Sequence, residues 1–199
     1  MKLILASNNK NKLLEFKEIL AGTGIEVIPQ SEAGCHFEVD ETGDTFEENA
    51  FLKAEAAMKA TGLPAVSDDS GLEVDALGGA PGVHSARYTG NHDDSDLDRR
   101  LFLMKNLEGE EHRTARFVSA ICCVFPNGDV LNARGTCEGS IATYMAGENG
   151  FGYDAMFIPE GESRTMGEMT HEEKNLISHR GRALREFARI LKEYCHADK

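Results

Sequence analysis

The sequence predicts an α/β fold with a mixed β-sheet. Segments with strand character alternate with segments of helical periodicity in the first half of the chain, and a long hairpin follows in the middle. Strands that alternate with helices favour parallel pairing, whereas a hairpin joins antiparallel strands. The combination therefore favours a mixed sheet flanked by helices over a purely parallel, doubly wound sheet.

The first part of the chain contains alternating strand and helix patterns. The expected elements are a strand at 2–6, a helix at 10–21, a strand at 25–29, a helix at 44–62 and a short strand at 64–67. The helix at 44–62 has the clearest limits, because Thr45 and Glu48 have the spacing of a capping box and Gly62 follows as a stop. We expect the short strand to end at Asp68 and Asp69.

The rest of the chain contains the hairpin and two further helices. The expected elements are a helix at 95–107, strands at 114–125 and 130–141, and a helix from 178 to about 194. The pair Asn127-Gly128 between the two strands is a strong hairpin signal. A pair with capping-box spacing, Thr170 and Glu173, precedes the last helix.

Composition limits the class of protein. With 199 residues the chain is long enough for one large domain or two small lobes around a shared core. A net charge of −13 disfavours binding to a nucleic acid polymer, whereas a small anionic ligand can still be held by a few lysines and a metal ion. No apolar run approaches the ~20 residues that span a bilayer, so we expect no membrane association and a cytoplasmic location.

The five cysteines indicate a reducing environment rather than a metal or disulfide framework. Their number is odd, and none of them forms a C-x-x-C pair, which makes a structural zinc site an unfavoured interpretation. Small buried thiols without a chemical role are the simpler explanation.

The segment LASNNKNK (5–12) is a candidate phosphate site. It lies where a strand gives way to a helix, so that free N–H groups and the positive end of the helix dipole face one spot. Ser7, Asn9 and Lys12 add donors and a charge, although the segment is not a P-loop. A polar helix cap with a solvated lysine explains the same residues.

Acidic residues just before one predicted helix and at the end of one predicted strand are candidate metal ligands. The segment VDETGDTFEENAFLK (39–53) carries Glu41 and Lys53, and VSDDSGLEV (66–74) carries Asp68 and Asp69. Neighbouring side chains in an extended chain point to opposite faces, so the two aspartates are expected to have different roles. One of them together with Glu41 would be enough for Mg²⁺, which keeps waters and substrate phosphates as its other ligands. The helix dipole alone also explains acids at a helix start.

Two later segments are candidates for binding a flat aromatic ligand. NGFGYD (149–154) places Phe151 between glycines, where its ring can stack on a base or simply belong to the core. THEEKNLISHRGRAL (170–184) offers Lys174, His179 and Arg180. An arginine at a helix start opposes the dipole, which argues for another use of Arg180, although a solvated helix start remains an alternative.

Together these segments resemble the inosine triphosphate pyrophosphatase family, the Ham1-like XTP/dITP diphosphatases. The motifs S-x-N-x-x-K, ETGDTFEENAFLKA, DDSGLEVDALGGAPGVHSARY, GFGYD and EKNLISHRGRAL occur in the family's order, and the resemblance spans residues 2–192. Two departures are small: His84 stands where members often have tyrosine, and Ala155 stands where GYDP is frequent.

The resemblance implies a fold, a reaction and a cofactor. The expected fold is a single ITPase-like domain over residues 1–199, in which a long central mixed sheet joins two lobes with the substrate in a cleft between them. The expected reaction is Mg²⁺-dependent hydrolysis of ITP, dITP or XTP to the monophosphate and pyrophosphate, which removes deaminated purines from the nucleotide pool. Members are usually homodimers.

The resemblance also implies roles for individual residues. The triphosphate is held by Lys53 and by a loop made of Ser7, Asn8, Asn9, Lys10, Asn11 and Lys12. Glu41 and Asp69 bind Mg²⁺, and Asp69 is the base that activates water. Ser70 contacts the substrate, Phe151 stacks on the base, and Gly152, Tyr153 and Asp154 line its pocket. Lys174, His179 and Arg180 read the base edge, where the donor-only guanidinium of Arg180 suits the O6 acceptor of hypoxanthine and xanthine.

Two other functions compete with this interpretation. A related pyrophosphatase of the Maf type, which acts on modified pyrimidine nucleotides, also opens with a strand and a polar phosphate loop, but it is disfavoured by the segments SHR and GFGYD. A nucleotide sensor without catalysis would need Lys12 and Phe151, yet it would not need Asp69 and Glu41.

Overall fold

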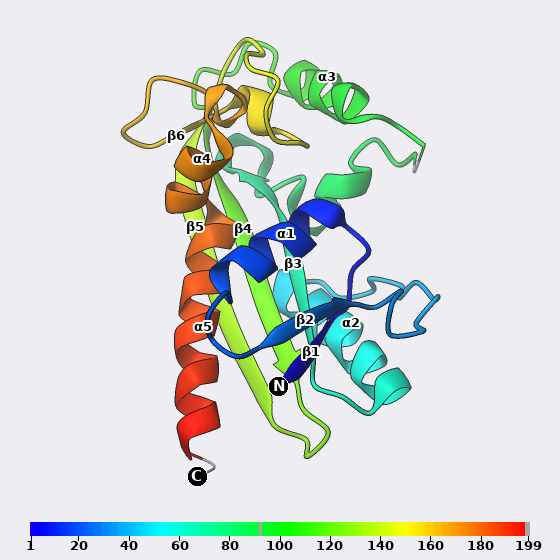
Figure 1. Ribbon diagram of the computed structural model, residues 1–199. Helices are drawn as coiled ribbons and strands as arrows, with labels where there is room; N and C mark the ends of the chain where they lie inside the picture. Colours follow the sequence, from blue (N-terminus) through cyan, green and yellow to red (C-terminus); the bar gives the residue numbers. More distant parts are fainter. Residues whose placement is uncertain (92, 198–199) are drawn as a thin grey trace. The chain divides into compact units, whose positions relative to one another are not determined.

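The computed structural model describes residues 1–91 and 93–197 (Figure 1). These residues fall into two compact units. Unit 1 comprises Met1–Asp69, Ser119–Gly135 and the chain from Arg180 onward, and unit 2 comprises Ser70–Val118 and Thr136–His179.

The strands form one mixed sheet, as the sequence predicted. They are β1 (Lys2–Leu5), β2 (Glu26–Pro29), β3 (Ala65–Val74), β4 (Thr114–Val124), β5 (Val130–Ile141) and β6 (Phe157–Pro159). In the described part of the chain their order in the sheet is β2-β1-β3-β4-β5-β6. Strand β1 pairs in parallel with both β2 and β3, whereas β5 and β6 are antiparallel.

The helices begin and end close to the predicted positions. They are α1 (Lys10–Ile19), α2 (Phe46–Thr61), α3 (Asp96–Asn106), α4 (His171–Ile177) and α5 (His179–Ala197), with short 3₁₀ turns at Asp75–Leu77, Gly82–Arg87, Asp154–Met156 and Met166–Glu168. Thr45 and Glu48 form the expected capping box of α2, and Gly62 ends that helix at a φ of 68°. None of the described helices is both long and apolar enough to cross a membrane.

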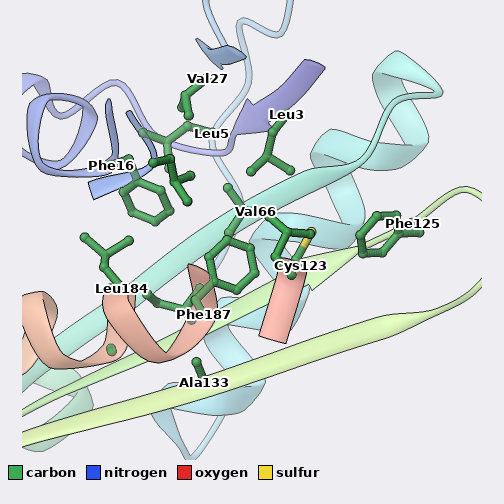
Figure 2. Close-up of a cluster of buried hydrophobic side chains, with 14 residues drawn as sticks. Leu3, Leu5, Phe16, Val27, Val66, Cys123, Phe125, Ala133, Leu184 and Phe187 are labelled. Atoms are coloured by element: carbon green, nitrogen blue, oxygen red, sulfur yellow. The ribbon is translucent and has the colours of Figure 1, made fainter. Parts of the chain in front are cut away.

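The core of unit 1 has helices on both faces of the sheet. Leu3 and Leu5 pack with Phe16 of α1 and with Leu184 and Phe187 of α5 (Figure 2). The residue between them on β1, Ile4, packs instead with Ala57 of α2. This division follows from the alternation of side chains along a strand, which lets β1 present an apolar residue to each face.

Unit 2 has its own core. It combines the second half of β3, the first half of β4, the end of β5 and helix α3 with the turns around β6. Its largest fully buried members are Leu72, Leu103, Leu107, Ile141 and Phe157.

Strand β3 differs from the prediction. The sequence placed a short strand at 64–67 that ends at the aspartates, but β3 runs from Ala65 to Val74 and passes through both Asp68 and Asp69. Apolar alternation resumes beyond them, since Leu72 and Val74 are buried. The predicted strand was too short because the polar run Asp68-Asp69-Ser70 interrupts the apolar pattern, whereas positive partners allow both carboxylates to be buried within the strand.

Two smaller elements were not predicted. Strand β6 has only three residues, too few for a periodic pattern to be visible. Helix α4 is separated from α5 by Ser178, whose extended backbone (φ −65°, ψ 153°) ends α4 before α5 begins.

Candidate active site

The candidate residues divide between the two units. Unit 1 contains Ser7–Lys12, Glu41, Lys53, Asp69 and Arg180, and unit 2 contains Ser70, Phe151–Asp154, Lys174 and His179.

The turn from β1 to α1 is partly a helix cap. The Oδ1 atom of Asn9 accepts hydrogen bonds from the N–H groups of Asn11 (2.9 Å) and Lys12 (3.3 Å), and Ser7 Oγ accepts one from the N–H of Asn9 (3.1 Å). Residues 8–11 are exposed. For Asn9 the helix-cap interpretation is therefore confirmed, and the cap side chains already accept from three of the backbone N–H groups at this turn.

Lys12 is not a solvated lysine. Its Nζ atom lies 2.9 Å from the backbone oxygen of Asp68 and 3.2 Å from Asp68 Oδ2. Burial lowers the pKa of Lys12, although the nearby Asp68 carboxylate opposes that effect. The side chain thus places a positive charge beside β3, at the level of the two aspartates.

Lys53 brings together the two predicted metal ligands. Its Nζ atom lies 2.6 Å from Glu41 Oε1 and 2.7 Å from Asp69 Oδ1, so a single ammonium group bridges the two carboxylates. Burial by itself lowers the pKa of Lys53, but Asp69 and Glu41 together raise it above its ordinary value. Burial raises the pKa of Asp69, and Glu41 adds to this, against the opposing effect of Lys53.

Asn49 holds the loop that carries Glu41 against α2. This buried residue, one helical turn before Lys53, accepts a hydrogen bond at Oδ1 from the N–H of Gly43 (2.8 Å). A side chain at Gly43 would lie 2.6 Å from Glu48 Cβ, so the close approach of the loop requires glycine there. Sequence reasoning missed Asn49, because an asparagine inside a helix carries no signal for a contact with a preceding loop.

The donor set around Lys53 fits a small divalent cation. Two carboxylates already converge on one positive group, and Mg²⁺ commonly takes one or two carboxylates with phosphate and water oxygens as its other ligands. Among the described residues no group of three or more His, Cys, Asp or Glu side chains is placed to hold a metal ion. The arrangement therefore suits an ion that completes its coordination with substrate.

Asp68 has different partners from Asp69, as strand alternation predicted. Its Oδ1 accepts a hydrogen bond from Ser119 Oγ (2.6 Å), and its Oδ2 lies 2.8 Å from Arg180 Nε. Although burial opposes ionisation, Lys12 and Arg180 hold the pKa of Asp68 well below its usual range. Asp68 is thus ionised, and it holds the side chains of Lys12 and Arg180 in place.

Arg180 takes part in a buried ion-pair network within unit 1. Its Nη1 atom lies 2.9 Å from Glu15 Oε2, and the residue is only 3% exposed. The sequence predicted that Arg180 reads the base edge, and it gave no sign of these carboxylate partners. Glu15 and Ser119 were missed because they meet Arg180 and Asp68 only through tertiary contacts, 165 and 51 positions apart in sequence.

In unit 2, Asp154 organises the loop that carries Phe151. Its Oδ2 atom accepts hydrogen bonds from the N–H of Phe151 (2.9 Å) and from Lys174 Nζ (2.6 Å). The same ammonium group lies 4.8 Å from the centroid of the Phe151 ring. Gly150 has a φ of 75°, and a Cβ at this position would lie 2.1 Å from Asp154 Oδ2, so this turn requires glycine.

The ring of Phe151 is exposed, although the Lys174 ammonium group lies close to it. It is 37% exposed, so the interpretation as a core phenylalanine is wrong. Lys174, by contrast, is buried by Asp154 and the ring. These three side chains form a compact group, which we call the Phe151 platform.

Two other candidates in unit 2, Tyr153 and His179, are packed into its interior. Tyr153 is buried in the core and its Oη donates to the backbone oxygen of Ser85 (2.8 Å). His179 is buried and stacks on Phe117, with 4.8 Å between ring centroids and 16° between ring planes. Ser70 is half-buried on β3.

None of the five cysteines, all of which the structure describes, takes part in a disulfide. Burial raises the pKa of the Cys122 thiol to about 12. This supports the interpretation of the cysteines as packing residues rather than nucleophiles.

Comparison with known proteins shows the family to which this chain belongs. The chain belongs to the Ham1 family, whose profile matches residues 3–190. It is 49% identical to a dITP/XTP pyrophosphatase of an Exiguobacterium species, over 93% of this chain and 94% of the relative. It is 47% identical to a dITP/XTP pyrophosphatase of Desulforamulus reducens over the whole of both chains. The structure of a HAM1 protein from Coxiella burnetii superposes with a TM-score of 0.91 at 42% identity and covers 97% of this chain and 99% of that one.

Proposed function

We propose that this protein is a dITP/XTP pyrophosphatase, which hydrolyses deaminated purine nucleoside triphosphates to the monophosphate and pyrophosphate. The observation that carries this proposal is identity of 46–49% along almost the whole chain with relatives of that activity. Membership of the Ham1 family over residues 3–190 removes the Maf-type alternative.

Unit 1 supplies the groups for the triphosphate. Lys12 and Lys53 carry positive charges beside the aspartates of β3, and Ser7 and Asn9 lie at the start of α1, the positive end of the helix dipole. A triphosphate has several negative charges, so the lysines and the positive helix end favour its binding. When nucleotide binds, Lys53 exchanges part of its contact with the carboxylates for phosphate oxygens.

Glu41 and Asp69 are the proposed ligands of Mg²⁺. When bound, the ion would neutralise phosphate charge and help to polarise the phosphorus under attack. Asp69 would accept the proton of the attacking water, while Lys12 and Lys53 would orient the phosphates. The water oxygen forms a bond to the α-phosphorus, the bond from that phosphorus to the bridging oxygen of the β-phosphate breaks, and pyrophosphate leaves.

Unit 2 supplies the groups for the base. Phe151 would stack on the purine, and Lys174 would donate to an acceptor on its edge. Hypoxanthine and xanthine have an acceptor at O6 where adenine has an amino donor, so a site built from donors rejects adenine. Lys174 and His179 are the base-reading candidates in this unit. For Arg180 the contacts with Asp68 and Glu15 support a structural role, and its proposed contact with O6 has to be tested separately.

The experiment that tests the proposal is an assay of pyrophosphate release. ITP, XTP, dITP, GTP and ATP are compared with and without Mg²⁺, and pyrophosphate is distinguished from phosphate. We expect Mg²⁺-dependent release of pyrophosphate from the deaminated nucleotides, and much slower release from ATP. Binding of ITP without turnover would contradict the proposal and favour the nucleotide sensor. The homodimer that the family resemblance implies is tested on the same sample by light scattering.

A further inference from the structure

Helix α3 contacts the Phe151 platform through one side chain. Asp96 is the first residue of this helix, and its Oδ2 atom accepts a hydrogen bond from the N–H of Gly152 at 2.7 Å. The preceding N–H group, that of Phe151, donates to Asp154. Two successive backbone donors of the loop are therefore held by two different carboxylates, of which one comes from the loop itself and the other from α3.

The helix cap does not explain the orientation of Asp96. Ser95 and Asp98 form the capping box of α3, since Ser95 Oγ accepts from the N–H of Asp98 and Asp98 Oδ2 accepts from the N–H of Ser95. Asp96 is left to interact outside the helix end. It is oriented by Arg99, whose Nη2 lies 2.5 Å from Asp96 Oδ1.

The half-buried carboxylate of Asp96 remains an anion. Partial burial tends to raise the pKa of Asp96, but the hydrogen bonds from Arg99 and from the N–H of Gly152 lower it below its ordinary value. A charged acceptor makes a stronger hydrogen bond than a neutral one. The contact is therefore suited to fixing a peptide group of the loop.

We propose that Asp96 is a positioning residue that holds the Phe151–Gly152 peptide and thereby keeps the exposed Phe151 ring in its base-binding orientation. Gly152 has a φ of 57°, in the left-handed region where glycine is least restricted, and the contact with Asp96 holds its N–H group. Asp96 contacts the loop backbone and not the ring, and its effect on the nucleotide is indirect. This inference rests on the proposed role of Phe151 in base binding.

The kinetic test compares Asp96→Ala with Asp98→Ala, a matched control. Both remove a carboxylate from the first turn of α3, but only Asp96 contacts the loop. We expect Asp96→Ala to raise the KM for ITP severalfold, up to about tenfold, with little change in kcat, because a ring that is no longer held in place loses part of its stacking on the base. Asp96→Asn keeps an acceptor oxygen and should restore most of the affinity. Equal changes in KM for Asp96→Ala and Asp98→Ala would overturn the proposal.

A second measurement needs no turnover. The chain contains no tryptophan, so a Phe151→Trp variant carries a single indole that reports on the platform. In this background we expect Asp96→Ala to lower the fluorescence anisotropy of the indole and to increase its quenching by acrylamide, whereas Asp98→Ala should leave both unchanged. An unchanged indole in Asp96→Ala would overturn the inference. If the parent protein fails to cleave ITP, the proposed function fails, and the fluorescence comparison alone decides whether Asp96 holds the loop.

Discussion

The carboxylate of Asp68 and the guanidinium of Arg180 form an ion pair in the interior of unit 1, although 112 positions separate them in the sequence. Glu15 binds the same guanidinium, and Lys12 binds the same carboxylate. These two acids and two bases have a formal net charge of zero. Since an isolated buried charge is costly, each member requires its partners.

Arg180→Ala is expected to destabilise the protein. The substitution leaves Asp68 and Glu15 with less positive charge around them in a buried setting, and breaking a buried ion pair costs about 3–5 kcal/mol of unfolding free energy. Arg189→Ala, on the same helix, removes an exposed arginine with two ion-pair partners and should have little effect. Chemical denaturation of both variants measures the difference, and equal stability of the two would refute the structural role of Arg180.

Asp69→Asn is expected to abolish most of the catalysis while the protein stays folded. The amide keeps the size of the carboxylate but cannot accept a proton, and loss of a general base costs at least about 10²-fold in rate. Asp75→Asn is the control, because Asp75 directly follows β3 yet is exposed and pairs with Arg116. The measurement is kcat for ITP with circular dichroism as the check on folding. Near-parental turnover of folded Asp69→Asn would exclude the proposed base.

Lys53→Ala and Lys12→Ala are each expected to raise the KM for ITP. A hydrogen bond from a charged donor contributes ~1.5–3 kcal/mol, which corresponds to roughly 10- to 150-fold in affinity. Lys59→Ala is the control for Lys53, since Lys59 lies on the same helix, is exposed and pairs only with Glu55 among the described ion pairs. Steady-state kinetics at saturating Mg²⁺ provide the values. If both variants bind ITP as the parent does, the two lysines are ion-pair partners of the carboxylates and not phosphate ligands.

Phe151→Ala is expected to weaken binding of the base and to spare binding of the phosphates. Stacking of a base on an aromatic ring contributes ~1–3 kcal/mol, so the KM for ITP should rise by roughly tenfold or more. Inorganic tripolyphosphate has no base, and its inhibition constant should stay the same. Tyr144→Ala, which removes another exposed aromatic ring from unit 2, serves as the control. A parallel loss of affinity for ITP and tripolyphosphate would show that Phe151 does not act on the base.

Local patterns were sufficient to predict most helix ends and the hairpin. The capping boxes at Thr45 and Thr170 each involve residues three positions apart, and Asn127-Gly128 defines its own turn. Such signals depend on backbone donors and dihedral preferences within one turn of the chain, and these are the same in any fold. The limits of β3 were missed because its middle is polar, and burial of that middle depends on cations from other elements.

The sequence by itself determined the family, the mixed α/β sheet and the set of candidate site residues, because each of these rests on short motifs that can be read in order along the chain. Only the tertiary structure decided which charges meet. It paired Lys53 with Glu41 and Asp69, gave Arg180 to Asp68 and Glu15, and joined Asp96 to the N–H of Gly152. Ion pairs and hydrogen bonds act over a few ångströms in space, whereas these partners lie 12 to 165 positions apart along the chain, and only folding brings them within that range.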